Sequence, residues 1–437
     1  MSLVPELVLR YFAQSSGELV VGGVPISTVV ANYGTPLFVY DSQVLDRKWD
    51  LLRNSLPENF DIFYSVKANP HPAILKHFLA RGCGLEIASR GEFHLALQAG
   101  CPPARVFFAG PGKTEVELEH VLKHGIGEIH IESLVEAKRV GALSRRLGVE
   151  ARVGIRVNPS GDAQGGAMRM GGKPAPFGVD EENLDVVLDL LSSETSVRVQ
   201  GIHVFMGTQI LDESILVPQY RKGVEIARRV ARELGRPLDT VDFGGGLGIP
   251  YFENDEELDV AELGKKLHAL MVEIESDPLF KGTRFVLEPG RFLVGEAGVY
   301  VTRVNDVKTS RGKRFLVLDG GMNHHLAASG NLGQVIKRNF PVWLLNKLDR
   351  QPEEKVDVVG PLCTPLDVLA RDVELPGAEV GDLVGVFQSG AYARTASPLG
   401  FLSHPSPAEV MVSEGKVRLI RKRGTYDDLA RDVPADY

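Results

Sequence analysis

Short apolar runs alternate with longer segments of helical periodicity over the first two thirds of the chain. Each run is rich in β-branched and aromatic residues, ends in polar residues or glycine, and precedes apolar positions at helical spacing. This alternation is typical of parallel βα units. Eight parallel strands close a (β/α)8 barrel, so the sequence predicts this α/β fold. The eight runs span 62–67, 84–89, 105–110, 128–133, 153–158, 201–207, 240–246 and 285–290.

Three of the predicted helices begin with the pattern Ser/Thr-x-x-Glu. In this pattern the first side chain and the glutamate each accept a hydrogen bond from the other residue's backbone N–H. Each pair follows a predicted strand, which supports the alternation of strands and helices. The pairs are Ser89 with Glu92, Thr114 with Glu117, and Ser133 with Glu136.

The pattern changes near residue 295, where β-rich runs continue without regular helices. We therefore predict a second, all-β domain over 296–437, a β-sandwich or β-barrel. Residues 1–35 contain a short β-rich run and are expected to join that domain, which leaves 36–295 for the barrel. Within the barrel, the glycine- and proline-rich stretch 160–178 is either a functional lid or a surface insertion.

Composition narrows the class of protein. The chain has 437 residues, of which 43% are hydrophobic, enough to bury one large core or two moderate ones. Lysine and arginine number 49 against 57 aspartate and glutamate, a net charge of -8, so we expect no nucleic-acid partner.

The spacing of the cysteines and the hydropathy of the chain indicate in which cellular compartment the protein is expected. Cys83, Cys101 and Cys363 lie far apart without metal-ligand spacing, so we predict no metal site and a reducing environment. No stretch approaches the ~20 apolar residues that span a bilayer, and the N-terminus does not resemble a signal peptide. We therefore expect a cytoplasmic protein with no membrane partner.

The carboxyl ends of barrel strands form the active site in this fold, and three of the predicted ends carry suggestive residues. The first ends at Lys67, where burial would favour a neutral amine for covalent chemistry, although a lysine that reaches solvent is the alternative. The seventh runs into the glycine turn 244–248, whose backbone amides can approach an anion. The eighth ends at Glu288, followed closely by Arg291. An amine, a phosphate-binding turn and a carboxylate together are what pyridoxal phosphate requires.

These residues belong to a longer series of motifs that resembles the fold-type III pyridoxal-phosphate decarboxylases, the group of diaminopimelate, ornithine and arginine decarboxylases related to alanine racemase. The resemblance implies removal of the α-carboxylate of an amino acid through an external aldimine and a quinonoid. It also implies a homodimer with shared active sites. The motifs, in order, are VGGVPIS, YGTPLFVYD, YSVKANP, LEIASRGE, IRVNP, GTQI, DFGGGLG, EPGR, GPLC and SGAY.

Position by position, the resemblance assigns roles to individual residues. Lys67 is expected to bind the cofactor covalently, and Glu288 to face its pyridinium nitrogen. Cys363, contributed by the neighbouring subunit, is the candidate proton donor and a substrate contact, and Arg291 is expected to contact both substrate and cofactor. The other expected cofactor contacts are Glu86, Thr208, Gly245, Gly246, Gly290 and Tyr392.

The chain departs from the family pattern at three places, one of which is 324–333, where the arginine and tyrosine that usually help to hold diaminopimelate are missing. Phe205 stands where the decarboxylases usually stack a histidine on the cofactor, and His203, two residues earlier, is either a cofactor neighbour or a core residue. Thr364 follows Cys363 where the relatives carry the acid that meets a distal ammonium. Without that counter-ion a buried ammonium is unfavourable, so we expect the substrate's distal end to be neutral, anionic or conjugated.

Decarboxylases of secondary metabolism or polysaccharide clusters, including those that act on carrier-protein-tethered amino acids, fit this expectation. Thr364, His324, His325 and Arg394 are the candidates to recognise the distal group, with a solvated loop as the alternative for the histidine pair. Three other functions remain open: diaminopimelate decarboxylase, amino-acid racemase, and a non-catalytic protein of pyridoxal-phosphate homeostasis. The GPLC cysteine argues against the racemase, and the second domain argues against the homeostasis protein.

Overall fold

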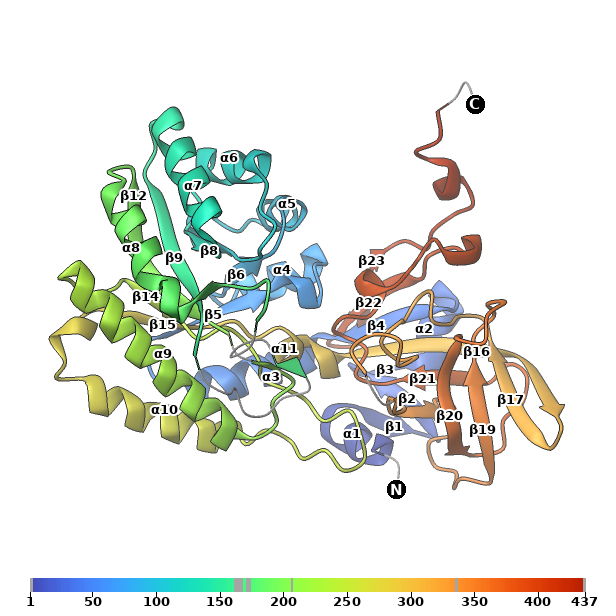
Figure 1. Cartoon of the computed structure of the whole chain (residues 1–437). Helices are drawn as coiled ribbons and strands as arrows, with labels where there is room; N and C mark the ends of the chain where they lie inside the picture. The colour runs from blue at the N-terminus through green and yellow to red at the C-terminus, as the bar shows by residue number, and fades with distance from the viewer. Residues whose placement is uncertain (1–2, 161–167, 170–173, 206, 335–336, 435–437) are drawn as a thin grey trace. The chain divides into compact units, whose positions relative to one another are not determined.

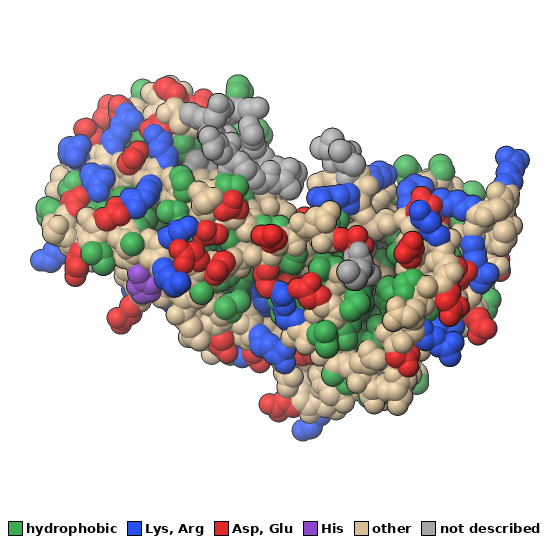
Figure 2. Space-filling view, turned by 90° about the horizontal axis from the view of Figure 1, so that it is seen from below, with side chains coloured by type: hydrophobic (Ala, Val, Ile, Leu, Met, Phe, Trp, Pro, Cys, Tyr) green, Lys and Arg blue, Asp and Glu red, His purple; other side chains and the backbone are tan. Residues whose placement is uncertain are grey.

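The computed structural model describes residues 3–160, 168–169, 174–205, 207–334 and 337–434. Most of the predicted lid segment therefore lies outside the described residues. No helix among the described residues is long and apolar enough to cross a membrane. On the face shown in Figure 2, basic and acidic side chains are interspersed.

The chain divides into two compact units. The barrel unit comprises Asp50–Ile249 and Glu257–Phe292, and the β unit comprises Met1–Trp49, Pro250–Glu256 and Leu293–Tyr437. Each unit thus draws on segments that are distant in the sequence, and each is described below by itself.

The barrel unit is built on eight parallel strands that close on themselves (Figure 1). Each strand pairs with the next along the chain, and β15 returns to pair with β5. All eight predicted runs are confirmed as these strands. They are β5 (Phe60–Ser65), β6 (Gly84–Ile87), β7 (Val106–Phe108), β8 (Glu128–Ile131), β9 (Ala151–Asn158), β12 (Val197–Val204), β14 (Thr240–Asp242) and β15 (Arg284–Leu287).

Helices alternate with these strands and lie around the barrel (Figure 1). Their buried apolar positions face the strands, and their starts carry the predicted caps. Thr114 and Glu117 form the complete reciprocal pair. The helices are α4 (Pro72–Leu79), α5 (Arg90–Gln98), α6 (Glu115–Lys123), α7 (Leu134–Leu147), α8 (Leu184–Ser193), α9 (Glu213–Leu234) and α10 (Val260–Ile274), whereas α3 (Ser42–Ser55) and α11 (Arg291–Val294) each run from one unit into the other.

The other two caps differ in detail from the prediction. Ser89 and Ser133 accept the expected N–H groups, 3.1 Å in each case. The glutamate of each pair instead accepts from the residue before the cap, as Glu136 does from the backbone N–H of Glu132 at 2.7 Å.

Aromatic side chains fill the barrel below its mouth. The rings of Phe63 and Phe107 stack with centroids 4.0 Å apart and cluster with Val286. Gly84 is required beside them, because a Cβ there would collide with the Phe63 ring. The barrel therefore has a packed core that supports the polar residues nearer its carboxyl end.

The β unit contains a small three-stranded sheet and a larger mixed sheet. In the larger sheet the strands run in the order β20-β19-β17-β16-β4-β22-β23, and β21 pairs with both β16 and β18. This confirms the β-rich second domain. The elements are α1 (Val4–Tyr11), β1 (Ala13–Ser15), β2 (Glu18–Val21), β3 (Val24–Pro25), α2 (Ile26–Tyr33), β4 (Leu37–Asp41), β16 (Gly298–Ser310), β17 (Lys313–Leu318), β18 (Val342–Leu344), β19 (Glu354–Val359), β20 (Val368–Leu375), β21 (Leu383–Val386), β22 (Ala408–Ser413) and β23 (Lys416–Arg421).

Three segments that the sequence assigned to the barrel, 36–49, 250–256 and 293–295, lie in the β unit. For the first segment the reason is β4, which pairs antiparallel with β16 and parallel with β22. For the second, the side chain of Gln388 donates a hydrogen bond to the carbonyl of Pro250. Local patterns predict a strand or a loop, but long-range hydrogen bonds decide which unit it joins.

Candidate active site

Lys67 lies in a single helical turn (Val66–Ala68) directly after β5, at the carboxyl end of the barrel. Its Nζ is 3.3 Å from Oε2 of Glu86, which lies in β6 and is almost fully buried. The lysine side chain is 46% exposed, so the burial that the sequence suggested is not found. The amine is instead held at the barrel mouth by a buried carboxylate.

Glu288 directly follows β15 and is 4% exposed. Its Oε2 lies 3.4 Å from Nε2 of His203, and no described residue donates a hydrogen bond to its Oε1. Burial lowers the pKa of His203 well below its usual value, so the imidazole is neutral. A buried carboxylate oxygen without a hydrogen-bond donor lowers the stability of the folded protein. The unpaired Oε1 therefore points to a ligand that carries a protonated group next to Glu288.

The glycine turn after β14 excludes side chains. Gly244 and Gly246 have φ of +66° and +100°, a region that favours glycine. A Cβ on Gly245 would collide with the carbonyl oxygen of Glu288. No described residue accepts a hydrogen bond from the backbone N–H of Gly245 or Gly246. A turn with free amides and no side chains fits an anion such as a phosphate.

Phe205 packs against this turn. It follows β12 and is half-buried, and a Cβ on Gly244 would lie 2.8 Å from its Cδ2. Thr208, in the short strand β13 (Gly207–Thr208), is half-buried and pairs with β10 (Met168–Arg169). Gly290 admits no side chain either, since a Cβ there would lie 2.9 Å from the Cβ of Ala68. These predicted contacts therefore surround the glycine turn and the end of β15.

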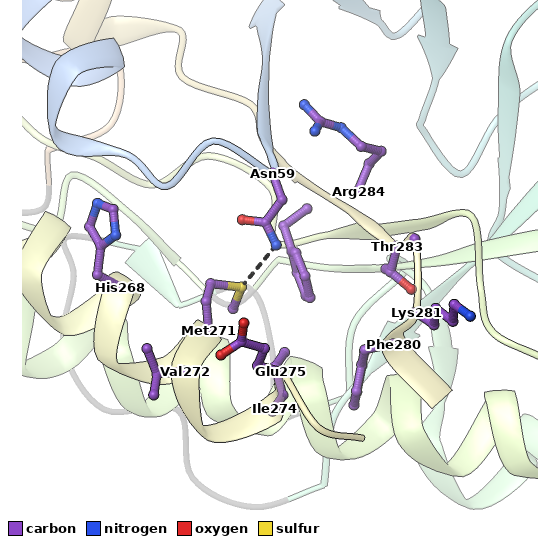
Figure 3. A pocket seen from close by; sticks show the side chains of 12 residues that line it. Asn59, His268, Met271, Val272, Ile274, Glu275, Phe280, Lys281, Thr283 and Arg284 are labelled. Atoms are coloured by element: carbon purple, nitrogen blue, oxygen red, sulfur yellow. Dashed lines mark hydrogen bonds between the residues drawn. The ribbon is translucent and has the colours of Figure 1, made fainter. Parts of the chain in front are cut away.

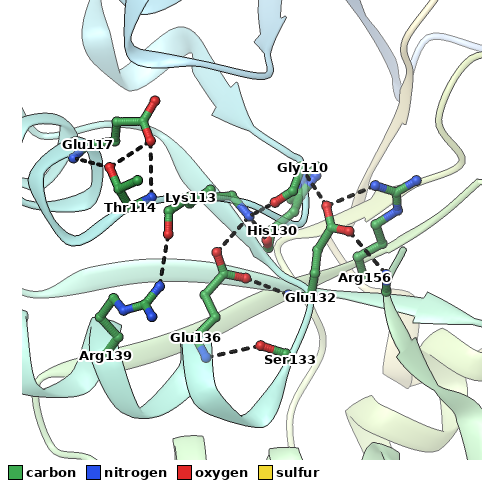
Figure 4. Close-up of polar contacts among 11 residues, drawn as sticks. Gly110, Lys113, Thr114, Glu117, His130, Glu132, Ser133, Glu136, Arg139 and Arg156 are labelled. Atoms are coloured by element: carbon green, nitrogen blue, oxygen red, sulfur yellow. Dashed lines mark hydrogen bonds and ion pairs between the residues drawn. The ribbon is translucent and has the colours of Figure 1, made fainter. Parts of the chain in front are cut away.

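Lys113 is a buried lysine that the sequence analysis did not assign. Its Nζ donates to the carbonyls of Gly110 and His130, 2.7 Å each, and pairs with Glu136 at 2.9 Å (Figure 4). With these partners all three ammonium protons are satisfied. Lys113 therefore ties together the ends of β7 and β8 and the start of α7.

Glu132, just after β8, holds Arg156 of β9 in place. The Arg156 guanidinium donates to Oε1 of Glu132 at 2.8 Å, and its centre lies 5.2 Å from the Phe177 ring (Figure 4 shows the first contact). The backbone N–H of Gly178 donates to Oε2 of Glu132 at 3.1 Å. Burial raises the pKa of Glu132, but the charges of Arg156 and Lys113 outweigh it and lower the value.

Glu92 is a second residue whose position the sequence did not reveal. Burial is the main cause that raises the pKa of Glu92 to about 7, and the nearby Glu86 carboxylate raises it further. A hydrogen bond from the backbone N–H of Ala88 lowers the pKa. The charge of Lys67 acts in the opposite direction. Glu92 was predicted only as a helix cap, yet it belongs to the electrostatic environment of the barrel mouth.

The predicted residues Cys363, Thr364 and Tyr392 belong to the β unit. Cys363 is exposed, and the other two are half-buried. The turn that carries the first two is fixed by Asp367, whose buried carboxylate accepts the backbone N–H of Leu362 at 2.9 Å. Asp367 thus holds the backbone beside Cys363 while the thiol stays exposed.

The predicted role of the histidine pair does not agree with the structure. His324 is 1% exposed, and its ring nitrogens lie 3.0 Å from Tyr300 Oη and 3.2 Å from the carbonyl of Pro405. His325 is fully buried, with Nε2 2.9 Å from Oγ of Ser389. Burial lowers the pKa of the two rings to about 4 and about 3. Both are neutral packing residues, and the solvated-loop alternative is also wrong.

Arg394 is likewise engaged within the β unit. Its Nε lies 3.7 Å from Oε2 of the buried Glu409, and its side chain is 12% exposed. The same glutamate accepts a hydrogen bond from Tyr40 Oη at 2.8 Å and pairs with Arg421. Arg394 therefore serves this ion-pair cluster, and we do not retain it as a substrate contact.

A groove of about 540 Å³ lies away from these residues. It is lined by the carboxyl end of α10 and the start of β15, including Met271, Glu275, Phe280 and Arg284 (Figure 3). Glu288 follows the opposite end of β15. The groove is therefore at the amino end of the barrel strands and does not coincide with the candidate site.

Four buried side chains with potential metal-ligand atoms also meet at the barrel centre: His130, His203, Asp242 and Glu288. The two imidazole rings stack with centroids 4.5 Å apart and an interplanar angle of 25°. Their place directly beside the glycine turn connects them with the site described above.

Comparison with known proteins identifies the family of this chain. Residues 42–295, more than half of the chain, match the family model described as "Pyridoxal-dependent decarboxylase, pyridoxal binding domain". The chain belongs to the pyridoxal-dependent decarboxylase family. It is a pyridoxal-phosphate-dependent amino-acid decarboxylase, as the sequence predicted.

Its relatives span nearly the whole chain. The L-glutamyl-[BtrI acyl-carrier protein] decarboxylase of Niallia circulans is 37% identical over 92% of this chain and 95% of its own length. The diaminopimelate decarboxylase of Aquifex aeolicus is 34% identical, with coverage of 95% and 96%. The crystal structure of diaminopimelate decarboxylase from M. jannaschii with L-lysine aligns with a TM-score of 0.89, 26% identity and 98% of each chain covered.

Replacing Gly245 with alanine tests the glycine turn. The new methyl group would collide with the backbone carbonyl of Glu288, so the turn must shift. We expect at least ~10-fold weaker binding of pyridoxal phosphate in an absorbance titration. Gly112→Ala is the matched control, because a Cβ there meets nothing within 4 Å. Equal affinities in the two variants would contradict the role of the turn.

Proposed function

We propose that this decarboxylase acts on an amino acid whose distal end carries no free ammonium, and that a glutamyl group tethered to a carrier protein is the best candidate. The observation that carries the proposal is Thr364, which stands beside Cys363 where an acid would meet a distal ammonium. A relative with 37% identity whose name specifies a carrier-linked glutamyl substrate supports it.

The barrel unit offers the groups that pyridoxal phosphate requires. The orphaned Oε1 of Glu288 suits a protonated ring nitrogen, and the free amides of Gly245 and Gly246 suit the phosphate. Lys67, at the mouth, is the amine proposed to bind the cofactor covalently, with Glu86 holding it in place. When bound, pyridoxal phosphate accepts the electron pair that remains when carbon dioxide leaves.

The ring contact is proposed for Phe205 instead of a histidine. Its half-buried side chain lies against Gly244, the first residue of the proposed phosphate turn. An aromatic face can stack on a flat ring, but phenylalanine donates no hydrogen bond. Thr208, Gly290 and Arg291 are proposed as further cofactor contacts around the same turn, and Arg291 also as a substrate contact.

Cys363 is proposed to hold the proton that the α-carbon receives after decarboxylation. The exposed thiol suits this task, since a proton donor must reach the reacting atom. We propose that it acts in the site of a second copy of the chain, so that the homodimer shares its active sites. Tyr392, from the SGAY motif, is proposed as a further cofactor contact.

A substrate panel tests the proposal. Release of carbon dioxide is measured from diaminopimelate, ornithine, free glutamate and a pantetheine-linked glutamyl thioester. We expect the thioester to exceed diaminopimelate in kcat/KM by ~100-fold, because a distal ammonium lacks its counter-ion. Thr364→Glu is the matched variant and should shift the ratio toward diaminopimelate. Efficient diaminopimelate turnover by the wild-type enzyme would contradict the substrate, though not the family.

A further inference from the structure

Asn331 joins a loop of the β unit to the turn that carries Cys363 and Thr364. Its Nδ2 donates a hydrogen bond to the carbonyl of Leu366 at 3.2 Å. The backbone N–H of Leu366 in turn donates to Oγ1 of Thr364 at 3.3 Å. The loop around Asn331 therefore lies beside the two residues that are proposed to face the substrate.

Lys337 is held in place by the same asparagine. Its Nζ donates to Oδ1 of Asn331 at 2.5 Å, while Nδ2 of Asn331 also donates to Oγ of Ser329 at 2.7 Å. The aliphatic part of the lysine packs on Gly330, where a Cβ would lie 2.9 Å from Cγ of Lys337. Gly330 has a φ of +70°, which favours glycine. Both ends of the lysine side chain are thus fixed before any ligand binds.

The ammonium of Lys337 has no acidic partner among the described residues, and the residue is exposed. An ammonium has three N–H donors, and the bond to Asn331 uses one of them. The neighbouring Arg338 differs, because it lies 3.8 Å from a carboxylate oxygen of Asp255 and 3.5 Å from the centroid of the Phe252 ring. Lys337 is therefore a cation that is available to an anionic ligand.

Two exposed leucines flank this lysine and asparagine. Leu366 is 51% exposed and Leu332, directly after Asn331, is 40% exposed. Apolar side chains beside one well-placed charge are typical of a site for a small organic ligand. The surface therefore suits a ligand with an apolar chain and an anionic group.

We propose that Lys337 binds a phosphate group on the distal arm of the substrate, and that Asn331 is the positioning residue that presents its ammonium. This inference rests on the proposed function, since a carrier protein holds its substrate on an arm that is attached through a phosphate ester. A lysine ammonium binds phosphate as a compact point charge. The phosphate is distant from the reacting carbon along the arm, which agrees with a lysine outside the turn of Cys363.

The same lysine adds to the discrimination against a distal ammonium. Thr364 already lacks the acid that would neutralise such a group. A fixed positive charge beside that turn repels an ammonium and attracts an anion. Lys337 also replaces the histidine pair as the candidate for distal recognition, because His324 and His325 are buried packing residues.

The test compares two substrates of the holoenzyme, a glutamyl thioester of pantetheine and the same thioester of 4′-phosphopantetheine. In the wild type the phosphate should raise kcat/KM roughly 5-fold, mainly through a lower KM. In Lys337→Met, which keeps the aliphatic chain but not the charge, the gain should fall below about twofold. Asn331→Asp places an acid next to Lys337 and should have the same effect. Added salt should reduce the gain in the wild type, because it screens an exposed contact.

Lys355→Met is the matched control. Lys355 is an exposed lysine at the opposite end of β19 from the turn of Cys363, and its loss should leave the gain as in the wild type. Thermal unfolding of each variant verifies that it folds. If Asn331→Asp does not fold, Lys337→Met still decides.

The outcomes separate this inference from the proposed function. Decarboxylation of both thioesters with equal kcat/KM by the wild type would overturn the phosphate site and leave the proposed function intact. A gain in Lys337→Met as large as in the wild type, or a loss of the gain in Lys355→Met, would overturn the assignment to Lys337. If neither thioester is decarboxylated, the proposed function fails and the inference fails with it.

Discussion

Replacing Lys67 with alanine is expected to abolish turnover and to remove the visible absorbance of the lysine-bound cofactor. Lys67 supplies the amine at the barrel mouth. Its partner Glu86, whose carboxylate oxygen lies 3.3 Å from the amine, is buried and cannot replace it. We expect release of carbon dioxide to fall by at least ~1,000-fold. Absorbance after dialysis and release of labelled carbon dioxide measure the two effects.

Subunit mixing provides a second readout of the same prediction. Lys67→Ala and Cys363→Ala subunits should each be nearly inactive alone. If the two residues act in one site shared between subunits, random mixing restores roughly one quarter of the wild-type activity. Retained turnover in Lys67→Ala would overturn the role of the lysine, whereas absence of recovery on mixing would contradict only the shared site.

Replacing Lys48 with methionine is expected to destabilise the β unit by ~3–5 kcal/mol. Lys48 on α3 pairs with Glu296 at 2.5 Å, and their side chains are 2% and 0% exposed. Without the lysine, Glu296 remains a buried charge with no cationic partner in this pair. Its charge already adds to the effect of burial in raising the pKa of Tyr11. Urea denaturation measures the loss in free energy of unfolding.

A double variant and a surface pair serve as controls. Lys48→Met with Glu296→Leu removes both charges and should recover most of the lost stability, because the cost arises from the unpaired carboxylate. Lys265→Met removes a pair with Glu262 in which the lysine is 75% exposed, and should cost less than ~1 kcal/mol. Similar losses for Lys48→Met and Lys265→Met would show that the buried pair contributes little.

The elements of the barrel could be predicted from the sequence because they are encoded locally. A buried parallel strand followed by an amphipathic helix leaves a pattern within a short window, and seven of the eight strands precede such a helix. The segment 36–49 was assigned to the barrel because it precedes the first βα unit. Its strand β4 joins the other sheet through hydrogen bonds to β16 and β22, partners that come much later in the chain.

The candidate site was predicted in part for the same reason. Lys67, Glu288 and the glycine turn each lie within a contiguous motif, so their chemistry is visible in the sequence. Lys113 lies outside the motifs, and Asp242 begins the motif DFGGGLG but has no local signal of its burial or its partners. Their importance depends on partners from other strands, which the closed barrel brings within reach.

The sequence by itself determined the alternation of strands and helices, the β-rich second unit and the residue types of a pyridoxal-phosphate site, because hydrophobic periodicity and short motifs are local properties. Only the tertiary structure decided that His324 is a buried packing residue and that Asp242 lies against Glu288. Burial and pairing depend on segments far apart in the chain, and these interactions set which side chains are charged.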